Sequence, residues 1–267
     1  VAQNRYYRFG DLTPEVLLRF EHFLKAGNLR LNTVTFYMRV LRAIYNKAVR
    51  AGYAPAQGSP FLAISFKEEK TRKLALRPEY LSRLAGWDFG RRTNLAEARD
   101  LFLFSFYTRG MSFVDMAYLK RTDITEGTIF YKRHKTGQPL SIRILPELQA
   151  LIDRYRSDDP WVLPILRCAP GTEAEEENEQ TLHRRYKAAL IKYLFSLSGI
   201  ARLLDIPQKL TFNAARHSWA SLARVHGIPV GVISQSLGHA SEKTTTIYLD
   251  ALNPELIDRA NEIVTRI

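Results

Sequence analysis

The sequence predicts a mainly α-helical protein of two domains, with one small antiparallel β-sheet in the second. Apolar residues recur at three- and four-residue spacing through most of the 267 residues, which is typical of helices with one buried face. A turn-rich break at residues 54–60 is soon followed by a charged stretch without such periodicity. Residues 128–144 depart from the helical pattern, because two β-rich stretches flank Thr136 and Gly137, and this predicts a hairpin.

Residues 1–66 are expected to form a small helical domain. A helix start is indicated at residues 11–15, where a capping residue precedes Pro14 and an acid lies in the first turn. A second helix begins near Asn32, and Gly52 is expected to end it. The basic residues that fall largely off its apolar face are Arg39, Arg42 and Arg50. Such a face either contacts nucleic acid or is simply a solvated basic surface.

Residues 67–76 are charged and are expected to be an interdomain linker, the alternative being a solvated loop within one domain. Residues 77–267 would then form the second, mostly helical domain that carries the hairpin. The helices expected after the hairpin cover residues 147–155, 180–197, 213–226, 230–237 and 244–248, followed by a terminal helix at 253–264.

The chain is strongly basic, with a net charge of +12. Most of this charge lies in residues 1–75, which carry 13 Lys or Arg against 5 Asp or Glu. Charge concentrated at one end favours a polyanionic partner, of which nucleic acid is a common example. The acidic stretch at residues 173–179 would repel DNA, so we expect it on a solvated loop that faces away from any duplex.

Cysteine content and hydropathy narrow the class of protein. Cys168 is the single cysteine, so the chain can form no internal disulfide and no multi-cysteine zinc site. We find neither a run of 18 apolar residues nor an N-terminal signal sequence, and therefore expect no membrane span. These features fit a cytoplasmic protein.

Two segments near the C-terminal end carry a spaced set of polar residues. Residues 211–220 read TFNAARHSWA, and residues 237–248 read LGHASEKTTTIY. This pattern resembles the tyrosine site-specific recombinases of the phage integrase family, whose catalytic fold is mostly helical with a small antiparallel sheet. The resemblance implies that Tyr248 attacks a DNA phosphodiester and that Arg216 and His239 contact the scissile phosphate.

A third segment, residues 104–119, resembles the part of the family that carries its first arginine, and Arg109 is the candidate here. The spacing differs from the usual one, because Asp115 follows six residues later and Ser112 stands where the arginine is expected. Either Arg109 reaches the site from one turn upstream, or the first phosphate clamp is missing. The pattern looks like the Bacteroides-type branch of the family.

Two further segments complete the resemblance: the hairpin, and residues 213–216 at the start of the pattern that contains Arg216. Lys135 lies at the hairpin tip, where the family carries a lysine that protonates the leaving 5′ oxygen, with Lys132 as the alternative. Asn213 stands where the family usually has a histidine; it can donate a hydrogen bond but cannot transfer a proton at neutral pH. Either Lys135 and His239 take over acid–base work, or Asn213 only positions the phosphate.

These residue types suit phosphodiester cleavage without a metal. A tyrosine can store the bond energy of the cut strand as a phosphotyrosine ester. Arginine has a planar, permanently charged fork that spans two phosphate oxygens, so Arg109 and Arg216 would replace a metal ion. The sequence contains no Asp/Glu/His cluster with metal-ligand spacing. We therefore expect no metal and no cofactor.

The resemblance also implies partners. They are double-stranded DNA, three further copies of the chain in a homo-tetramer on paired sites, and accessory DNA-bending or directionality proteins, acting near the bacterial nucleoid. The small basic domain at residues 1–66 would be the DNA core-binding domain, and residues 77–267 the catalytic domain. Two alternatives stay open: a DNA-binding regulator of the same fold that has lost catalysis, and a type IB topoisomerase.

Overall fold

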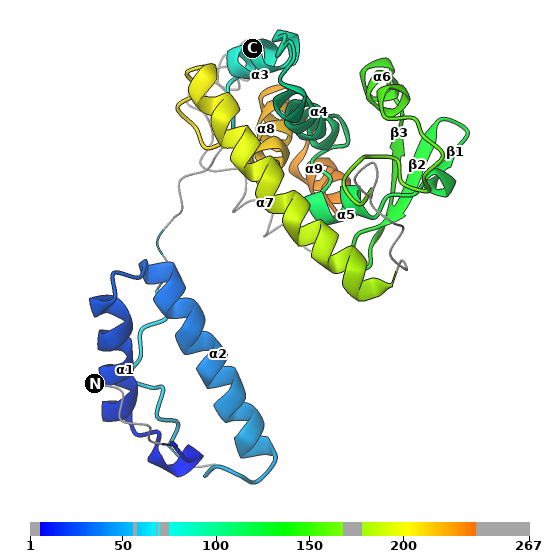
Figure 1. Cartoon of the computed structure of the whole chain (residues 1–267). Coiled ribbons are helices and arrows are strands. Elements are labelled where there is room, and N and C mark those ends of the chain that lie inside the picture. Colours follow the sequence, from blue (N-terminus) through cyan, green and yellow to red (C-terminus); the bar gives the residue numbers. More distant parts are fainter. Residues whose placement is uncertain (1–5, 56–57, 68, 70–74, 168–177, 239–267) are drawn as a thin grey trace, which may run out of the picture. The chain divides into compact units, whose positions relative to one another are not determined.

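A computed structural model describes residues 6–55, 58–67, 69, 75–167 and 178–238 (Figure 1). The chain divides into two compact units, residues 1–72 and 73–267. The described part is mostly helical with a single three-stranded antiparallel sheet, which confirms the predicted fold class. None of the described helices is long and apolar enough to cross a bilayer.

The first unit is an antiparallel helix pair with a strap against it. The short helix η1 (Phe9–Asp11) leads into α1 (Pro14–Ala26), and α2 (Leu31–Arg50) follows. Thr13 caps α1 by accepting a hydrogen bond from the amide of Val16. The strap is defined as residues 58–67 and 69. The buried residues come from both helices and the strap: Leu17, Leu24, Val34, Met38, Tyr45, Phe61 and Ile64.

Hydrogen bonds fasten the strap to α2. The Asn32 amide donates to the Glu69 carbonyl at 2.9 Å and its oxygen accepts from the Glu69 amide at 2.8 Å. Thr35 donates to the Lys67 carbonyl at 2.8 Å. The chain is therefore still packed on α2 at Lys67 and Glu69, the first part of the segment expected to be a linker.

The second unit is built around α4 (Thr93–Tyr107). This helix packs against α6 (Pro146–Arg154), α7 (Glu179–Leu203) and α8 (Phe212–Val225) (Figure 1). Its residues 101–104 are all buried, so it has no solvent face along its centre. The remaining helices are α3 (Pro78–Gly86), α5 (Phe113–Ala117), η2 (Arg121–Asp123) and α9 (Val230–Ser236).

Helix α7 ends six residues later than the sequence pattern predicts, because it continues through Gly199 to Leu203. Glycine normally weakens a helix interior. Here the position faces Leu95, whose Cδ2 would lie 3.7 Å from an added Cβ, so a small residue packs well. Ile200 and Leu204 are buried in the core beyond it, and this burial extends the helix.

The sheet has the order β1 (Ile124–Thr125), β2 (Thr128–Lys132), β3 (Pro139–Arg143), all antiparallel. The β2–β3 register pairs Ile129 with Ile142 and Tyr131 with Leu140. The predicted hairpin is thus present, with β1 as an additional strand. Its turn closes with hydrogen bonds from the Gly137 amide to the Arg133 carbonyl and from the Arg133 amide to the Gln138 carbonyl.

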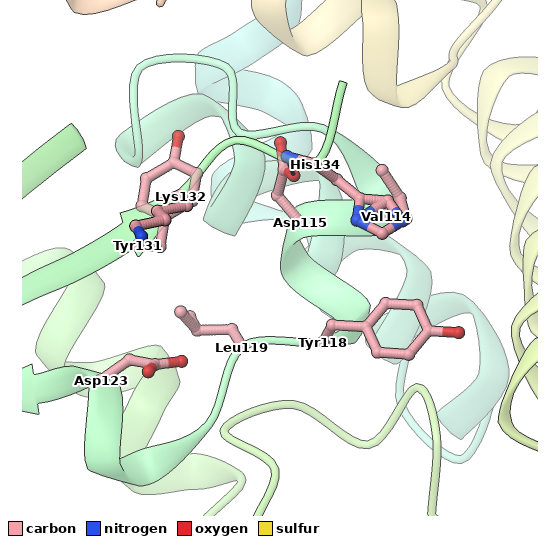
Figure 2. Close-up of a pocket in the computed structure, with 8 residues that line it drawn as sticks. All are labelled: Val114, Asp115, Tyr118, Leu119, Asp123, Tyr131, Lys132 and His134. Carbon is pink, nitrogen blue, oxygen red and sulfur yellow. Dashed lines mark hydrogen bonds between the residues drawn. The ribbon is translucent and has the colours of Figure 1, made fainter. Parts of the chain in front are cut away.

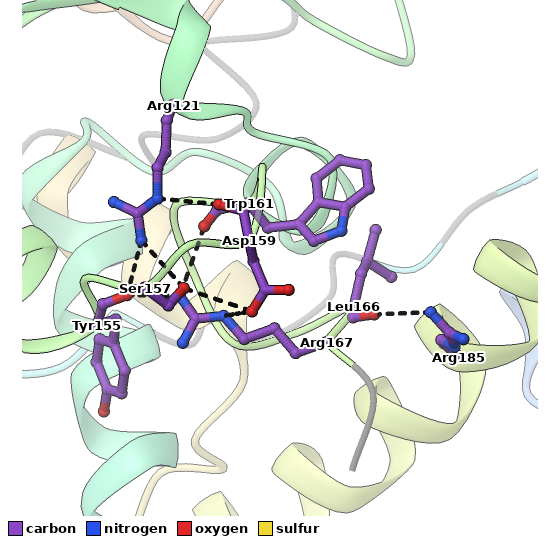
Figure 3. A network of polar contacts seen from close by, with 8 residues as sticks. All are labelled: Arg121, Tyr155, Ser157, Asp159, Trp161, Leu166, Arg167 and Arg185. Atoms are coloured by element: carbon purple, nitrogen blue, oxygen red, sulfur yellow. Dashed lines mark hydrogen bonds and ion pairs between the residues drawn. The ribbon is translucent and has the colours of Figure 1, made fainter. Parts of the chain in front are cut away.

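The loop that follows α6 is fixed by two arginines (Figure 3). The Arg121 guanidinium donates to the carbonyls of Asp159 at 3.1 Å and Tyr155 at 2.9 Å. Arg167 donates to the same Tyr155 carbonyl and pairs with the Asp159 carboxylate at 3.2 Å. These contacts fasten residues 155–167 to the start of η2, next to the sheet.

Candidate functional site

Arg216 lies at the centre of the candidate site and is only 6% exposed. It is on the first turns of α8, which Thr211 caps by accepting from the amide of Ala214. The Arg216 guanidinium donates to the carbonyl of Gly110 at 2.8 Å and to the carbonyl of Leu237. Two main-chain oxygens from separate segments therefore fix the direction in which this guanidinium points.

The backbone at Gly110 lies directly on Arg216. A Cβ at position 110 would come within 2.5 Å of the Arg216 Cγ, which no side chain could tolerate. Gly110 also has a positive φ of 80°, and Arg109 precedes it with a φ of 57°. A non-glycine residue in the left-handed region is uncommon. The two residues turn the chain sharply from α4 into α5 and bring Arg109 next to Arg216 in the fold.

The side chain of Arg109 extends from this turn toward the sheet. Its Nη1 lies 3.4 Å from the Ser141 carbonyl of β3, a long hydrogen bond, and the side chain is only partly buried. Ser112 has a different task, because its hydroxyl caps α5 and donates to the Asp115 carboxylate at 2.6 Å. Arg109 therefore lies at the turn before α5 and Ser112 at the start of that helix, and the identity of the first phosphate clamp stays a prediction.

Asp115 joins α5 to the hairpin. Its second carboxylate oxygen accepts the backbone amide of His134 at 2.7 Å. The His134 ring also stacks on Tyr118, with ring centroids 5.8 Å apart and planes inclined by 20°. Lys135 follows at the exposed tip of the hairpin. The residue directly before the candidate proton donor is therefore held in place through both its backbone and its side chain.

Arg133 joins the hairpin to the turn after α9, a contact that sequence reasoning missed. Its Nη1 donates to the Gly238 carbonyl at 2.5 Å. Gly238 has a φ of 62°, and an added Cβ would lie 2.9 Å from Leu140 Cδ1 and 3.2 Å from Arg133 Cδ. The only signal in the sequence was the Leu-Gly turn itself, since nothing in the pattern assigns its partner.

Tyr131 is a second residue that the sequence pattern did not single out. Burial, followed by the negative charge of Asp115, raises the pKa of Tyr131 to about 12. The positive charges of Arg216, Arg133 and Arg109 oppose this rise, so all three arginines lie near enough to act on the phenol. At neutral pH this tyrosine is therefore an uncharged neighbour of the arginine cluster.

A small pocket opens beside this cluster, between α5 and the hairpin (Figure 2). Figure 2 shows Asp115 and His134 together on one side of it and Asp123 on the other. The residues that line it are Val114, Asp115, Tyr118, Leu119, Asp123, Tyr131, Lys132 and His134. Lys132 is exposed at the end of β2.

Asn213 is exposed on the first turn of α8, three residues before Arg216. Its Nδ2 lies 3.1 Å from Nε2 of His217, one turn further along the helix. His217 is thus a side-chain partner of Asn213 within the same helix. The two residues form a polar pair beside the buried arginine.

Other predicted residues lie elsewhere. His239 and Tyr248, with the expected helices at 244–248 and 253–264, are outside the described residues. Arg39, Arg42 and Arg50 are exposed on α2 of the first unit. Arg42 stacks on Phe66 at 4.1 Å, and Arg39 donates to the Phe66 carbonyl at 3.4 Å. Within the described ranges, no three His, Cys, Asp or Glu side chains gather in a way that could hold a metal ion.

Comparisons with known protein families match both units. Residues 2–67 match the phage integrase SAM-like domain, and residues 92–254 match the phage integrase family. The chain is similar to tyrosine recombinase XerA of Pyrococcus furiosus, with 26% identity over 60% of this chain and 54% of XerA. It is also similar to tyrosine recombinase XerC of Rhodospirillum centenum, with 27% identity over 57% of this chain and 42% of XerC. The matches thus span about half of each relative.

Solved structures share the fold. A lambda integrase dimer bound to a COC′ core site superposes with a TM-score of 0.65 and 16% identity, covering 92% of this chain and 82% of that one. The Tn1549 transposon integrase in complex with a circular intermediate DNA gives 0.66 and 15%, covering 96% and 86%. The XerH recombinase bound to a palindromic difH substrate gives 0.63 and 18%, covering 93% and 69%.

The matched family segment includes every candidate of the C-terminal box, namely Asn213, Arg216, His239 and Tyr248, together with Arg109 and Lys135. The Bacteroides-type branch stays a prediction. By the extent of this match, the chain belongs to the phage integrase family of tyrosine site-specific recombinases.

Proposed function

We propose that this chain is a site-specific DNA recombinase that cuts and rejoins double-stranded DNA through a 3′-phosphotyrosine intermediate. The observation that supports it most is the buried guanidinium of Arg216, oriented by the carbonyls of Gly110 and Leu237. A buried arginine with fixed direction beside a second arginine is suited to hold a phosphate whose negative charge grows during reaction.

In the proposed reaction, the Tyr248 oxygen attacks the scissile phosphorus. The new bond joins the tyrosine oxygen to phosphorus, the bond from phosphorus to the 5′ oxygen breaks, and the tyrosine proton passes to solvent or a neighbouring base. Lys135 gives its proton to the departing 5′ oxygen. A 5′ hydroxyl from another strand then reverses these steps, and the reversal joins the strands in a new order.

Arg109 and Arg216 neutralise the non-bridging phosphate oxygens in this scheme. His239 and Asn213 donate hydrogen bonds to the same phosphate. Because Asn213 has no titratable proton, acid–base work falls to Lys135 and His239. The pair of Asn213 and His217, 3.1 Å apart, would fix the amide orientation.

The domain roles follow from the same proposal. Residues 1–66 would be the core-binding domain, residues 67–76 the linker and residues 77–267 the catalytic domain. Duplex contacts are proposed for Arg39, Arg42 and Arg50 on α2 and for Lys132 near the hairpin. The active assembly would be a homo-tetramer on paired sites in the bacterial nucleoid, assisted by DNA-bending or directionality proteins.

A suicide substrate tests the proposal. Duplexes selected by binding from a random-sequence pool supply the site, and a nick placed at successive positions across it traps the cut strand. The wild-type chain should form an SDS-resistant protein–DNA adduct, whereas Tyr248→Phe should bind the same duplex without forming one. Binding without any adduct from the wild-type chain would instead identify a regulator.

The DNA product of the reaction distinguishes a recombinase from the remaining alternative, a type IB topoisomerase. A recombinase brings two sites together and yields four-way junctions, whereas a type IB topoisomerase relaxes supercoiled DNA and yields none. Two-dimensional gels of reactions with paired sites distinguish these outcomes.

A further inference from the structure

The hairpin that carries Lys135 is attached to the rest of the unit at two successive residues. The His134 amide binds Asp115 of α5 at 2.7 Å. One residue earlier, the Arg133 guanidinium binds the Gly238 carbonyl at 2.5 Å. These attachments lead to two different segments, α5 and the turn after α9, so together they restrict how the hairpin tip can tilt.

Arg133 also holds the turn through its own backbone. Its carbonyl accepts the Gly137 amide at 2.7 Å, and its amide donates to the Gln138 carbonyl at 2.8 Å. The side chain therefore leaves from the base of the turn that presents Lys135. Any movement of the Arg133 side chain relative to Gly238 is passed to that turn.

The other end of the contact is linked to Arg216. The Leu237 carbonyl accepts from Arg216, and Gly238 is the next residue. Gly238 has no Cβ, and this leaves room for the aliphatic part of the Arg133 side chain. A Cβ added at this position would lie 3.2 Å from the Arg133 Cδ. One short turn therefore contacts both the buried phosphate clamp and the arginine that directs the hairpin.

We propose that Arg133 is a positioning residue that sets the placement of the Lys135 ammonium relative to Arg216. With this placement, Lys135 lies within reach of the leaving 5′ oxygen of the phosphate that Arg216 holds. This inference rests on the proposed function. A general acid acts only within hydrogen-bond reach of the atom it protonates, so a small tilt of the tip is enough to impair it.

The test uses a leaving group that needs no proton. In a nicked duplex whose scissile 5′ oxygen is replaced by sulfur, the thiolate leaves without a general acid. Arg133→Met keeps most of the stem but removes the donors, and it should lower single-turnover cleavage of the all-oxygen duplex on the order of 10-fold or more. The sulfur substrate should recover most of that loss, as it should for Lys135→Ala.

Matched variants make the result specific. Arg133→Lys retains one donor for the Gly238 carbonyl and should restore much of the all-oxygen rate. Arg216→Ala removes a phosphate clamp, so sulfur should not rescue it. Arg143→Met removes an exposed arginine from β3 of the same hairpin and should cleave both substrates like the wild type. Thermal melting of each variant confirms that it is folded.

Each of four results would overturn the inference. The first is that Arg133→Met leaves cleavage of the all-oxygen duplex unchanged. The second is that it loses equal activity on both substrates, which would indicate a general structural effect. Rescue by a neutral methylphosphonate at the scissile position, in place of sulfur, would identify Arg133 as a direct phosphate contact. Absence of any adduct from the wild-type chain overturns the proposed function together with this inference.

Discussion

Gly110 illustrates how one residue without a side chain determines the candidate site. Its φ of 80° is readily available to glycine, and its α-carbon lies against the stem of Arg216. The Gly110 carbonyl then becomes an acceptor for the Arg216 guanidinium at 2.8 Å. Close backbone approach and hydrogen bonding thus come from the same residue, next to Arg109.

Replacing Gly110 should therefore be far more costly than replacing a glycine that only adopts a positive φ. Gly110→Ala combines the backbone strain with overlap against Arg216 and should lower the free energy of unfolding by about 3 kcal/mol or more. Gly127→Ala is the control, because Gly127 has a φ of 69° and open space around it, and it should cost about 1 kcal/mol. Urea denaturation measures both; equal losses would show that the contact with Arg216 is unimportant.

Asn213 and Arg216 occupy one face of α8 but should differ sharply in their effect on rate. Asn213 offers a neutral donor, so Asn213→Ala should slow cleavage only modestly and Asn213→His should keep or raise it. Arg216→Ala removes the charge that we propose to stabilise the transition state, and it should lower the cleavage rate on the order of 10²-fold or more. Single-turnover cleavage of a nicked site measures all three, and an Asn213→Ala variant as inactive as Arg216→Ala would reverse this ranking.

At the scale of elements, α4 and α6 are joined by a buried carboxylate. Asp100 is 2% exposed and accepts from Arg99 at 2.5 Å, Arg154 at 2.7 Å and the Tyr155 hydroxyl at 2.8 Å. A buried charge with three donors is well satisfied, and removing it leaves the Tyr155 hydroxyl without this acceptor and both guanidiniums without their carboxylate. Arg99 keeps its hydrogen bond to the Trp87 carbonyl at 2.9 Å. This network supports the helix on which the Arg109 turn begins.

Removing that carboxylate should destabilise the second unit. Asp100→Ala should lower the free energy of unfolding by about 3 kcal/mol, because it removes the carboxylate that Arg99, Arg154 and Tyr155 share in a buried place. Tyr155→Phe deletes only one donor and should cost about 1 kcal/mol. Asp153→Ala, on the exposed face of α6, serves as the control and should change little. Denaturant melts followed by circular dichroism compare the three variants. An Asp100→Ala variant with an unchanged free energy of unfolding would show that this carboxylate does not stabilise the unit.

The elements themselves could largely be predicted from spacing, whereas their contacts could not. Helices at 147–155, 213–226 and 230–237 lie within one residue of α6, α8 and α9, because each has a clear apolar face and a stop. The end of α7 was missed, since the burial of Ile200 is a tertiary effect. The pairing of Arg133 with Gly238 joins residues 105 positions apart, and no local pattern encodes such a contact.

In the candidate site too, residue types could be read from the sequence, whereas the contacts between them could not. The types and spacing of Asn213 and Arg216 predict a phosphate site directly from the sequence, and this role stays a prediction. Whether Arg109 could reach that site depended on the left-handed turn at residues 109–110, which no propensity predicts for an arginine. The task of Ser112 as a helix cap and partner of Asp115 likewise became clear only from the fold.

At the scale of the whole molecule, buried tyrosines should make stability depend on alkaline pH. Burial is the largest cause that raises the pKa of Tyr131 to about 12, and it also raises the pKa values of Tyr155 and Tyr193. In the unfolded chain these phenols lose their protons near pH 10, while the folded chain keeps them. The unfolded state then binds fewer protons, so stability is full below pH 10 and falls as pH rises above it.

Each such tyrosine should contribute about 1.4 kcal/mol of destabilisation per pH unit once the unfolded form has ionised. Urea melts between pH 9 and pH 11.5 should show this steepening loss, and Tyr131→Phe should reduce its slope. Phenolate absorbance of the folded protein provides a second measurement. If Tyr131 ionises near pH 10 without unfolding, the environment assigned to it is wrong.

The positive charge gathered in the second unit leads to a last prediction, about metal ions. Arg109 and Arg216 come from separate elements and both act on the Tyr131 phenol, so their charges converge on one region. In the proposed reaction, the two guanidiniums would supply the charge that a bound divalent ion brings to a phosphodiester, and Lys135 would supply the proton for the leaving oxygen. Cleavage of the nicked site should therefore proceed at an unchanged rate in excess EDTA. A rate that falls in EDTA and returns with Mg²⁺ would mean that the arginines alone do not neutralise the transition state, and the proposed division of roles would have to include a metal.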